Sequence, residues 1–354
     1  MDFDINNLLR ENIKRLVPYS SARDEFKGEA SIYLDANENS FGSPLPVAYN
    51  RYPDPMQWKL KQRIAEIKGV PAEHIFIGNG SDEVIDIMYR AFCNPGVDNV
   101  LICPPTYGMY EVSAHINDVS IKKVPLTSDF QLDIEGLELA VDEQTKLIFV
   151  CSPNNPTGNA LNRNDIELLL NNFGGIVVID EAYINFSRHR SFIQELTEYP
   201  NLVVMQTLSK AWGLAALRVG MAFTSTLIVD VMNKIKPPYN IGQASQALAL
   251  EALQRVDEVN AWIRETVAER QKLSEELGRL AVVLAVYPSD ANFLLVKTVD
   301  PRGIYRQLVD KGIIVRDRSR VELCEGCLRI TVGTPEENRA LLAVMEAIPL
   351  ATAH

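Results

Sequence analysis

Short apolar runs alternate with amphipathic helical stretches along the chain from about residue 75 onward. Most of these runs are nearly continuous in Val, Ile, Leu and Phe, which is typical of strands covered on both faces. Between two of them, Ile85, Met88, Tyr89 and Phe92 stand at positions i, i+3, i+4 and i+7 and predict a helix with one apolar face. Strands that alternate with helices predict a mainly parallel sheet wrapped on both sides. The seven runs read IFIGNG, NVLICPP, IKKVPL, KLIFVC, IVVIDEAY, NLVVMQT and RVGMAFTS.

The last two of these runs are separated by a short connection. Neighbouring parallel strands need a crossover of about a dozen residues or more, whereas antiparallel neighbours do not. The sequence therefore predicts an α/β fold whose large, mainly parallel seven-stranded sheet contains one antiparallel strand.

The pattern then changes to a long charged helical stretch, roughly Val256 to Leu280, which we interpret as a helix that bridges two domains. A smaller α+β unit follows, with strands expected in NFLLVK, IIVRDRS and CLRITVG and a helix over about 304–311. A closing helix is predicted after Thr334, because Thr334 and Glu337 offer a capping box and Pro335 stands at the first helical position.

These patterns predict a division of the chain into three parts. The first fifty residues are rich in Asn, Ser and Pro and indicate an extended arm, of which we assign 1–30 as the N-terminal arm proper. We expect a large domain over 31–255, and a bridging helix with a small C-terminal domain over 256–354.

Composition excludes several classes of function. The chain has 354 residues, of which 47% are hydrophobic, enough for two domains. Its net charge of −11 repels nucleic acid and anionic membranes, so we expect neither as a partner, and any anion site must be built locally. The N-terminus lacks the pattern of a signal peptide, and no apolar run approaches membrane-spanning length. We therefore expect a cytoplasmic protein.

The five cysteines are an odd number scattered through a long chain, which favours reduced thiols over a disulfide framework. Cys324 and Cys327 form a CxxC, but there is no second such pair and the four histidines show no ligand spacing. A turn that contains Gly326, ahead of the strand CLRITVG, explains the pair better than a metal site. We expect no metal.

Polar residues follow the predicted strands at the point where ligands bind in open α/β sheets, outside the carboxyl ends of the strands. After the first strand, Gly80, Ser81 and Asp82 open a helix whose N–H groups could hold an anion, although an ordinary helix cap uses the same residues. After the second strand comes Tyr107, which could stack on a flat ligand or could be a core tyrosine.

The next strand ends add chemistry of a different kind. Asn155 lies in a polar loop, and Asp180 follows four apolar residues, so its carboxylate needs a cationic or N–H partner. Ser209 and Lys210 follow the sixth strand, and Arg218 stands eight residues after Lys210. Each residue alone has an ordinary structural explanation, but five strand ends converge on one crevice.

Four of these features together match pyridoxal phosphate (PLP): N–H donors for an anion, an aromatic ring for stacking, a buried carboxylate and an amine. The PLP aldehyde needs a lysine, its ring nitrogen needs an acidic partner, and its phosphate needs N–H donors and an arginine. We therefore expect Lys210 to be an enclosed lysine that is covalently engaged with this cofactor.

The segments SPNNPTG, DEAY and TLSKAWGLAALRVG resemble those of the fold-type I PLP-dependent aminotransferases. Together with LDANENS, RYPDP, GNGSDE, PPTYGMY and CLRITVGT, they are similar to the histidinol-phosphate aminotransferase family, in order over nearly the whole chain. The resemblance implies a homodimer with shared active sites, and L-histidinol phosphate and 2-oxoglutarate as substrates in histidine biosynthesis.

The resemblance also implies residue roles. It gives Lys210 the Schiff base, Asp180 the pyridine nitrogen, Asn155 and Tyr183 the phenolic oxygen, and Tyr107 the ring stack. Two further sets follow: the cofactor phosphate would be held by Gly80, Ser81, Asp82, Ser209, Arg218 and Tyr52 of a neighbouring subunit, and the substrate by Tyr19, Asn37, Arg316 and Arg329.

Two other functions compete with this one. An aromatic-amino-acid aminotransferase or a threonine-phosphate decarboxylase on the same scaffold would keep the cofactor residues, so that a substrate panel is needed to separate them. A non-catalytic regulatory protein would be expected to lack the lysine or to carry a DNA-binding segment, and this acidic chain has Lys210 and no such segment.

Overall fold

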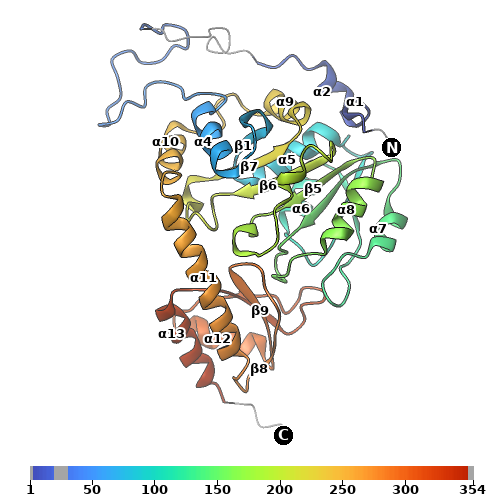
Figure 1. The fold of residues 1–354 in the computed structure, drawn as a ribbon, viewed down its shortest axis with the longest axis vertical. Coiled ribbons are helices and arrows are strands. Elements are labelled where there is room, and N and C mark those ends of the chain that lie inside the picture. Colours follow the sequence, from blue (N-terminus) through green and yellow to red (C-terminus); the bar gives the residue numbers. More distant parts are fainter. Residues whose placement is uncertain (1–2, 20–30, 350–354) are drawn as a thin grey trace.

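A computed structural model describes residues 3–19 and 31–349 of the chain. Figure 1 shows a large sheet with helices around it, and a smaller sheet with its own helices toward the C-terminus. The long helix α11 (Val256–Leu277) runs from one to the other and packs against both parts. A helix therefore occupies the predicted bridging stretch, and its last residue is Leu277, slightly earlier than expected.

The large sheet has seven strands in the order β1-β7-β6-β5-β4-β2-β3. All seven predicted runs form strands, and β7 is antiparallel to both β1 and β6 while the other pairs are parallel. The mainly parallel sheet with one antiparallel strand is thus confirmed within the described residues. The strands are β1 (Ile75–Asn79), β2 (Asn99–Ile102), β3 (Ser120–Lys123), β4 (Thr145–Cys151), β5 (Ile176–Asp180), β6 (Leu202–Thr207) and β7 (Val219–Thr224).

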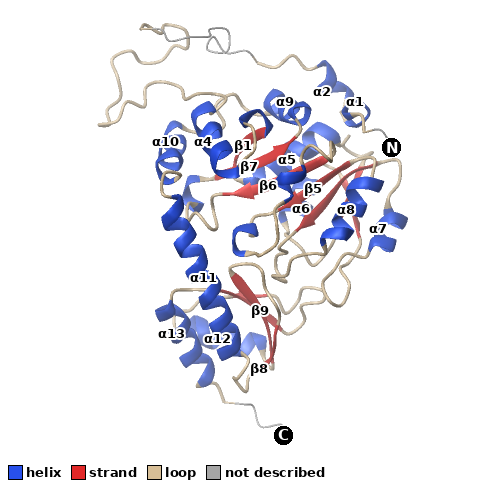
Figure 2. Cartoon of the chain, viewed as in Figure 1, coloured by secondary structure: helices blue, strands red, loops and turns tan. Residues whose placement is uncertain are grey.

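Alternate residues of these strands belong to two separate apolar clusters, because successive side chains point to opposite faces of a sheet. One face is covered by α5 (Ser81–Phe92), α6 (Met109–Ile116) and α9 (Thr226–Ile235). The other is covered by α4 (Trp58–Lys68), α7 (Ile134–Ala140), α8 (Arg163–Asn172) and α10 (Gln243–Ala252). Figure 2 shows these helices around the red strands.

Helix α5 illustrates what holds the layers together. Its predicted apolar face of Ile85, Met88, Tyr89 and Phe92 is completely buried. Removing side chains of this size from water contributes about 1.5–3 kcal/mol each. This packing fixes the helix, and with it the position of its N-terminus at the edge of the sheet.

Strand direction decides which residues meet at that edge. Strand β7 is antiparallel to both β1 and β6, so β1 runs parallel to β6 and the carboxyl ends of β1, β2, β4, β5 and β6 share one edge. The first residue of β7 lies at the same edge, because that strand runs the opposite way. Arg218, directly before β7, is therefore brought beside Gly80, and the Gly80 N–H donates to the Arg218 carbonyl oxygen at 2.8 Å.

The smaller sheet has the strand order β10-β11-β9-β8. The capping box is confirmed: the Glu337 N–H donates to Thr334 Oγ1 at 3.3 Å, and the Thr334 N–H donates to Glu337 Oε2 at 2.8 Å. Strand β8 was not predicted, and the run IIVRDRS yields a strand of only two residues. The elements are β8 (Val283–Val286), β9 (Phe293–Thr298), β10 (Arg316–Asp317), β11 (Cys327–Thr331), α12 (Pro301–Asp310) and α13 (Pro335–Glu346).

The N-terminal segment contains the short helices α1 (Ile5–Leu8) and α2 (Glu11–Arg15). Residues 31–57 form no helix or strand and extend outward before they return to α4 in Figure 1. The predicted arm 1–30 lies partly outside the described residues, and the domain boundaries stay predictions. Short 3₁₀ helices complete the description: η1 (Ala72–His74), η2 (Ile184–Phe186), η3 (Phe192–Glu195) and η4 (Ala215–Leu217).

Candidate active site

A cavity of about 670 Å³ lies at the carboxyl edge of the large sheet, where strands β10 and β11 of the small sheet face it. Its size is that of an ordinary small-molecule site. The structure brings eleven of the predicted site residues into its lining: Ser81, Asp82, Tyr107, Asn155, Asp180, Tyr183, Ser209, Lys210, Arg218, Arg316 and Arg329.

One end of the cavity is an anion site built on the start of α5. No side chain caps that helix, so its first N–H groups are available to a ligand. Gly80 has φ 77°, and a Cβ there would lie 2.5 Å from Arg218 Nη2. Arg218 Nη2 pairs with Asp82 Oδ2 at 3.2 Å, and the Tyr107 hydroxyl donates to Asp82 Oδ1 at 3.0 Å. The Asp82 carboxylate thus orients Arg218 and Tyr107. The main-chain N–H of Asp82 takes no part in these contacts and can face an anion.

Asp180 ends strand β5 and is buried. Tyr110 donates its hydroxyl to Asp180 Oδ2 at 2.7 Å, and the Ala182 N–H donates to Asp180 Oδ1 at 3.1 Å. Burial raises the pKa of the Asp180 carboxyl, and these two donors act against that rise. Two donors leave lone pairs on a buried carboxylate, which a further N–H donor at the cavity can use.

Lys210 follows strand β6, and here the structure corrects the sequence prediction, since this residue is exposed rather than enclosed. Its Nζ lies 5.7 Å from the centroid of the Tyr183 ring. The surrounding protein still removes part of the water around the ammonium, which lowers the pKa of Lys210, and the nearby positive charge of Arg329 lowers it further. An amine with a lowered pKa loses its proton more easily and is then a nucleophile or a base.

The opposite end of the cavity is formed by the small sheet. Arg329 lies on β11 directly opposite Arg316 on β10. Arg329 Nη1 donates to Asn155 Oδ1 at 2.5 Å, and its guanidinium lies 5.3 Å from the centroid of the Phe293 ring. The buried ring of Tyr183 packs edge-on against Phe293 at 5.1 Å. These contacts join the loop after β4 to the small sheet across the cavity.

Two residues of the site were not predicted from the sequence. Tyr110, which donates its hydroxyl to Asp180, is completely buried, and its ring stacks on Phe149 with 4.9 Å between the ring centroids. Arg318 lines the cavity together with Arg316 and Arg329. A weak signal existed for each of them, since Tyr110 lies in the same PPTYGMY segment as Tyr107, and Arg318 follows Arg316 at the spacing of one strand face.

Four predicted residues are absent from the lining of this cavity: Gly80, which directly precedes the lining residue Ser81, and Tyr19, Asn37 and Tyr52, which lie elsewhere in the chain. Tyr52 and Asn37 line a separate hollow of about 450 Å³, where the Tyr52 ring stacks on Tyr239 at 4.5 Å. Tyr19 is 74% exposed and lines another hollow. Their assigned roles, in which Tyr52 acts from a neighbouring subunit, stay predictions.

The cysteines form no disulfide, and all five are buried. The CxxC is a turn, as predicted: the Cys327 N–H donates to the Cys324 carbonyl oxygen at 3.0 Å, and Gly326 has φ 79°. Within the described residues, no group of three or more His, Cys, Asp or Glu side chains could hold a metal ion. No helix in that part of the chain is long and apolar enough to span a membrane.

Known proteins give this arrangement a context. Residues 39–345 match the family described as aminotransferase class I and II. The histidinol-phosphate aminotransferase of Cytophaga hutchinsonii is 56% identical over 98% of this chain and 99% of that protein. Its counterpart from Parabacteroides distasonis is 54% identical, with the same shares covered.

Solved structures agree. The histidinol-phosphate aminotransferase from Clostridium acetobutylicum superposes with a TM-score of 0.78 at 23% identity, covering 84% of this chain and 90% of that one. The enzyme from Sinorhizobium meliloti, solved in complex with pyridoxal-5'-phosphate, gives 0.77 at 26% identity, covering 88% and 89%. The fold is that of the fold-type I PLP-dependent transferases, and the chain belongs to the histidinol-phosphate aminotransferase family of the class I and II aminotransferases.

Proposed function

We propose that this chain transfers the amino group of L-histidinol phosphate to 2-oxoglutarate, giving imidazole-acetol phosphate and L-glutamate in histidine biosynthesis, with PLP bound in the cavity. Family membership supports the reaction. The observation that carries it in this structure is the charge of the cavity. Two carboxylates, Asp82 and Asp180, stand among five cationic side chains of a protein whose net charge is −11, namely Lys210, Arg218, Arg316, Arg318 and Arg329.

The residues at the large sheet fit PLP. The uncapped start of α5, Ser209 and Arg218 offer N–H and hydroxyl donors to a phosphate. A side chain at position 80 would collide with Arg218, so the glycine leaves the space at the start of α5 free for an anion. The buried Asp180 carboxylate would gain a charged partner from a proton-bearing ring nitrogen, which would offset the cost of its burial, and the Tyr107 ring offers a stacking surface.

Each end of the cavity would then have its own anion. The cofactor phosphate takes the end built on α5, and the anionic group of the amino donor takes the arginines of the small sheet. Glutamate has a distal carboxylate and histidinol phosphate has a phosphate, and the planar fork of Arg329 can donate paired N–H groups to either one.

When bound, PLP supplies an electrophilic carbonyl carbon and a ring that withdraws electrons. Lys210 is the residue whose amine would hold the cofactor at that carbon. The same amine, with its lowered pKa, would be able to take up and release the proton at Cα of the donor. The Asp180 carboxylate would hold the ring nitrogen in its charged form throughout, and Asn155 and Tyr183 would hold the phenolic oxygen.

A substrate panel tests the reaction. Purified protein loaded with PLP is mixed in single turnovers with L-histidinol phosphate, L-phenylalanine or L-threonine O-phosphate, and the absorbance of the bound cofactor is followed. We expect fast conversion to the amine form with L-histidinol phosphate, reversed by 2-oxoglutarate. A clear preference for L-phenylalanine, or release of CO₂ from L-threonine O-phosphate, would favour the scaffold relatives instead.

We also propose a homodimer and a cytoplasmic location. Several apolar side chains of the segment 31–57 are strongly exposed, among them Ile32, Leu34 and Phe41, and a second copy could cover them. The buried free thiols suit a reducing compartment. Sedimentation of the purified protein and fractionation of cells test these two proposals separately.

A further inference from the structure

The hairpin of β10 and β11 carries a third arginine into the cavity. Pairing continues one residue beyond β10, because the Arg318 N–H donates to the Cys327 carbonyl oxygen at 2.9 Å. Residues two apart on a strand point to the same face, so Arg318 lies on the cavity side with Arg316. The residue between them, Asp317, accepts the Ser319 N–H at 2.8 Å and does not line the cavity.

Arg316, Arg318 and Arg329 line the same cavity without a carboxylate paired to any of them in the described part of the chain. Within the described residues, the side chains of Arg316, Arg318 and Arg329 form no ion pair with a carboxylate, and the Nε of Arg318 is buried without a hydrogen-bond partner. Burial lowers the pKa of Arg318, and the positive charges of Arg329 and Arg316 lower it further. A buried N–H donor without a partner is costly, and so are like charges held together. An anion with several oxygens would relieve both costs.

We propose that Arg318 is a specificity-determining residue, which together with Arg316 and Arg329 binds the phosphate of the phosphorylated amino donor. This inference rests on the proposed function and adds a residue and a selectivity to it. A phosphate monoester carries nearly two negative charges and three acceptor oxygens at neutral pH, whereas the distal carboxylate of glutamate carries one charge and two oxygens. A third guanidinium therefore favours the phosphorylated donor over glutamate.

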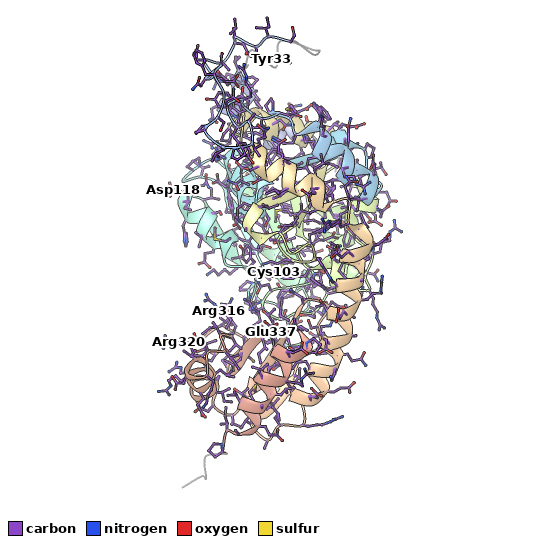
Figure 3. The ribbon with its side chains drawn as sticks, turned by 90° about the vertical axis from the view of Figure 1, so that its left-hand side faces the viewer. Tyr33, Cys103, Asp118, Arg316, Arg320 and Glu337 are labelled. Carbon is purple, nitrogen blue, oxygen red and sulfur yellow. The ribbon has the colours of Figure 1, made fainter. Side chains whose placement is uncertain are left out.

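The test compares Arg318→Gln with Arg320→Gln in the PLP-loaded enzyme. Arg320 is an exposed arginine two residues further along that does not line the cavity, so the control removes the same charge from the same segment. Figure 3 labels Arg316 and Arg320 on this part of the small sheet. Three quantities are measured: kcat/KM for L-histidinol phosphate, kcat/KM for glutamate, and the inhibition of the glutamate reaction by inorganic phosphate.

We expect Arg318→Gln to lower kcat/KM for L-histidinol phosphate by about 10- to 100-fold, mainly through KM, as for the loss of one charge-assisted hydrogen bond. For glutamate we expect a change below about threefold, and inhibition by phosphate weakens about tenfold or more. Arg320→Gln should resemble the wild type in all three. By contrast, Arg329→Lys should weaken both donors.

Equal losses for both donors, or unchanged inhibition by phosphate, would overturn the inference. Arg318→Lys keeps the charge, and an intermediate loss in that variant rules out simple misfolding. If the wild type did not accept L-histidinol phosphate, the proposed function would fail, while the phosphate inhibition of the glutamate reaction would still decide the role of Arg318.

Discussion

At the scale of single residues, the site surrounds the buried Asp180 carboxylate with hydrogen-bond donors that partly offset the cost of its burial. A carboxylate is costly to bury, and burial raises the pKa of this one. Tyr110 and the Ala182 N–H each donate to one of its oxygens and favour the ionised form. These donors offset only part of the effect of burial, since the pKa of Asp180 stays raised, and a positive ring nitrogen would add the stabilisation that the carboxylate still lacks.

The role of Lys210 gives the first prediction. We expect Lys210→Ala to abolish multiple-turnover transamination and to leave the fold intact, because the residue is exposed in the cavity and belongs to none of the apolar core clusters. Lys210→Arg should not restore activity, since a guanidinium stays protonated and cannot act as the nucleophile. Coupled detection of glutamate, with a thermal melt as the folding control, measures both. Sustained turnover by the alanine variant would remove Lys210 from its role.

Tyr110→Phe gives the second prediction. The change removes one donor to ionised Asp180, so the pKa of Asp180 rises above its already raised position. Activity that needs the carboxylate should be present above that pKa and lost as the pH falls through it, so the acidic limb of the kcat/KM profile moves to higher pH. We expect activity at neutral pH to fall by roughly tenfold or less, the scale of one hydrogen bond of about 1.4 kcal/mol.

A pH profile of the phenylalanine variant, measured beside the wild type with saturating PLP, checks this. The ring of Tyr110 is kept, so its stacking on Phe149 persists and serves as the internal control for packing. An acidic limb that stayed in place would mean that the Ala182 N–H alone sets the ionisation of Asp180.

At the scale of elements, the direction of β7 matters most. Had this strand been parallel to β6, its first residue would lie at the far edge of the sheet, and Arg218 with it. The connection after Lys210 is too short for a crossover, so β7 starts at the same edge at which β6 ends and runs the opposite way. The same reversal lets β1 run parallel to β6 and places the start of α5 beside Arg218.

The sequence predicted these long elements because their patterns are strong. Apolar runs identified six strands of the large sheet and the run IKKVPL identified the polar edge strand β3, while the Thr334 capping box identified α13. Strand β8 was not predicted, because it is partly exposed and its register shifts between Val283 and Ala285, so that its sequence shows no regular alternation of apolar and polar residues. The exposure of Lys210 and the bond from Tyr110 to Asp180 depend on side-chain packing across elements, which periodicity does not encode.

Gly80 provides a prediction about the turn from β1 to α5. Gly80→Ala places a Cβ 2.5 Å from Arg218 Nη2 at a residue with φ 77°. We expect a stability loss of about 1–3 kcal/mol from backbone strain, and PLP binding weakened by about tenfold or more as Arg218 is displaced. Gly242→Ala is the control, since its φ is −64° and nothing lies within 4 Å of its added Cβ. Thermal melts and cofactor titration measure both effects, and equal results for the two variants would contradict this account.

At the scale of the whole molecule, one chain leaves apolar surface exposed. Phe41 is fully exposed, and the neighbouring stretch around Tyr49 and Tyr52 also shows large apolar side chains to solvent. This stretch belongs to residues 31–57, which form no helix or strand and extend outward before they return to α4 in Figure 1. Apolar surface carried on an extended segment is a reason to expect a partner, and a second copy of this chain would cover it symmetrically.

The last prediction asks whether such a partner completes the active site. Tyr52 does not line the cavity of its own chain, so a role for it in binding the cofactor phosphate requires a second subunit. If sites are shared, a heterodimer of one Lys210→Ala chain and one Tyr52→Ala chain has one site with both residues intact. Random exchange of subunits should then recover roughly a quarter of wild-type activity from two weakly active variants. Kinetics after co-refolding, with each variant refolded alone as the control, measure the gain. If Tyr52 acted within its own chain, no combination would contain an intact site and the mixture would be no more active than its parts.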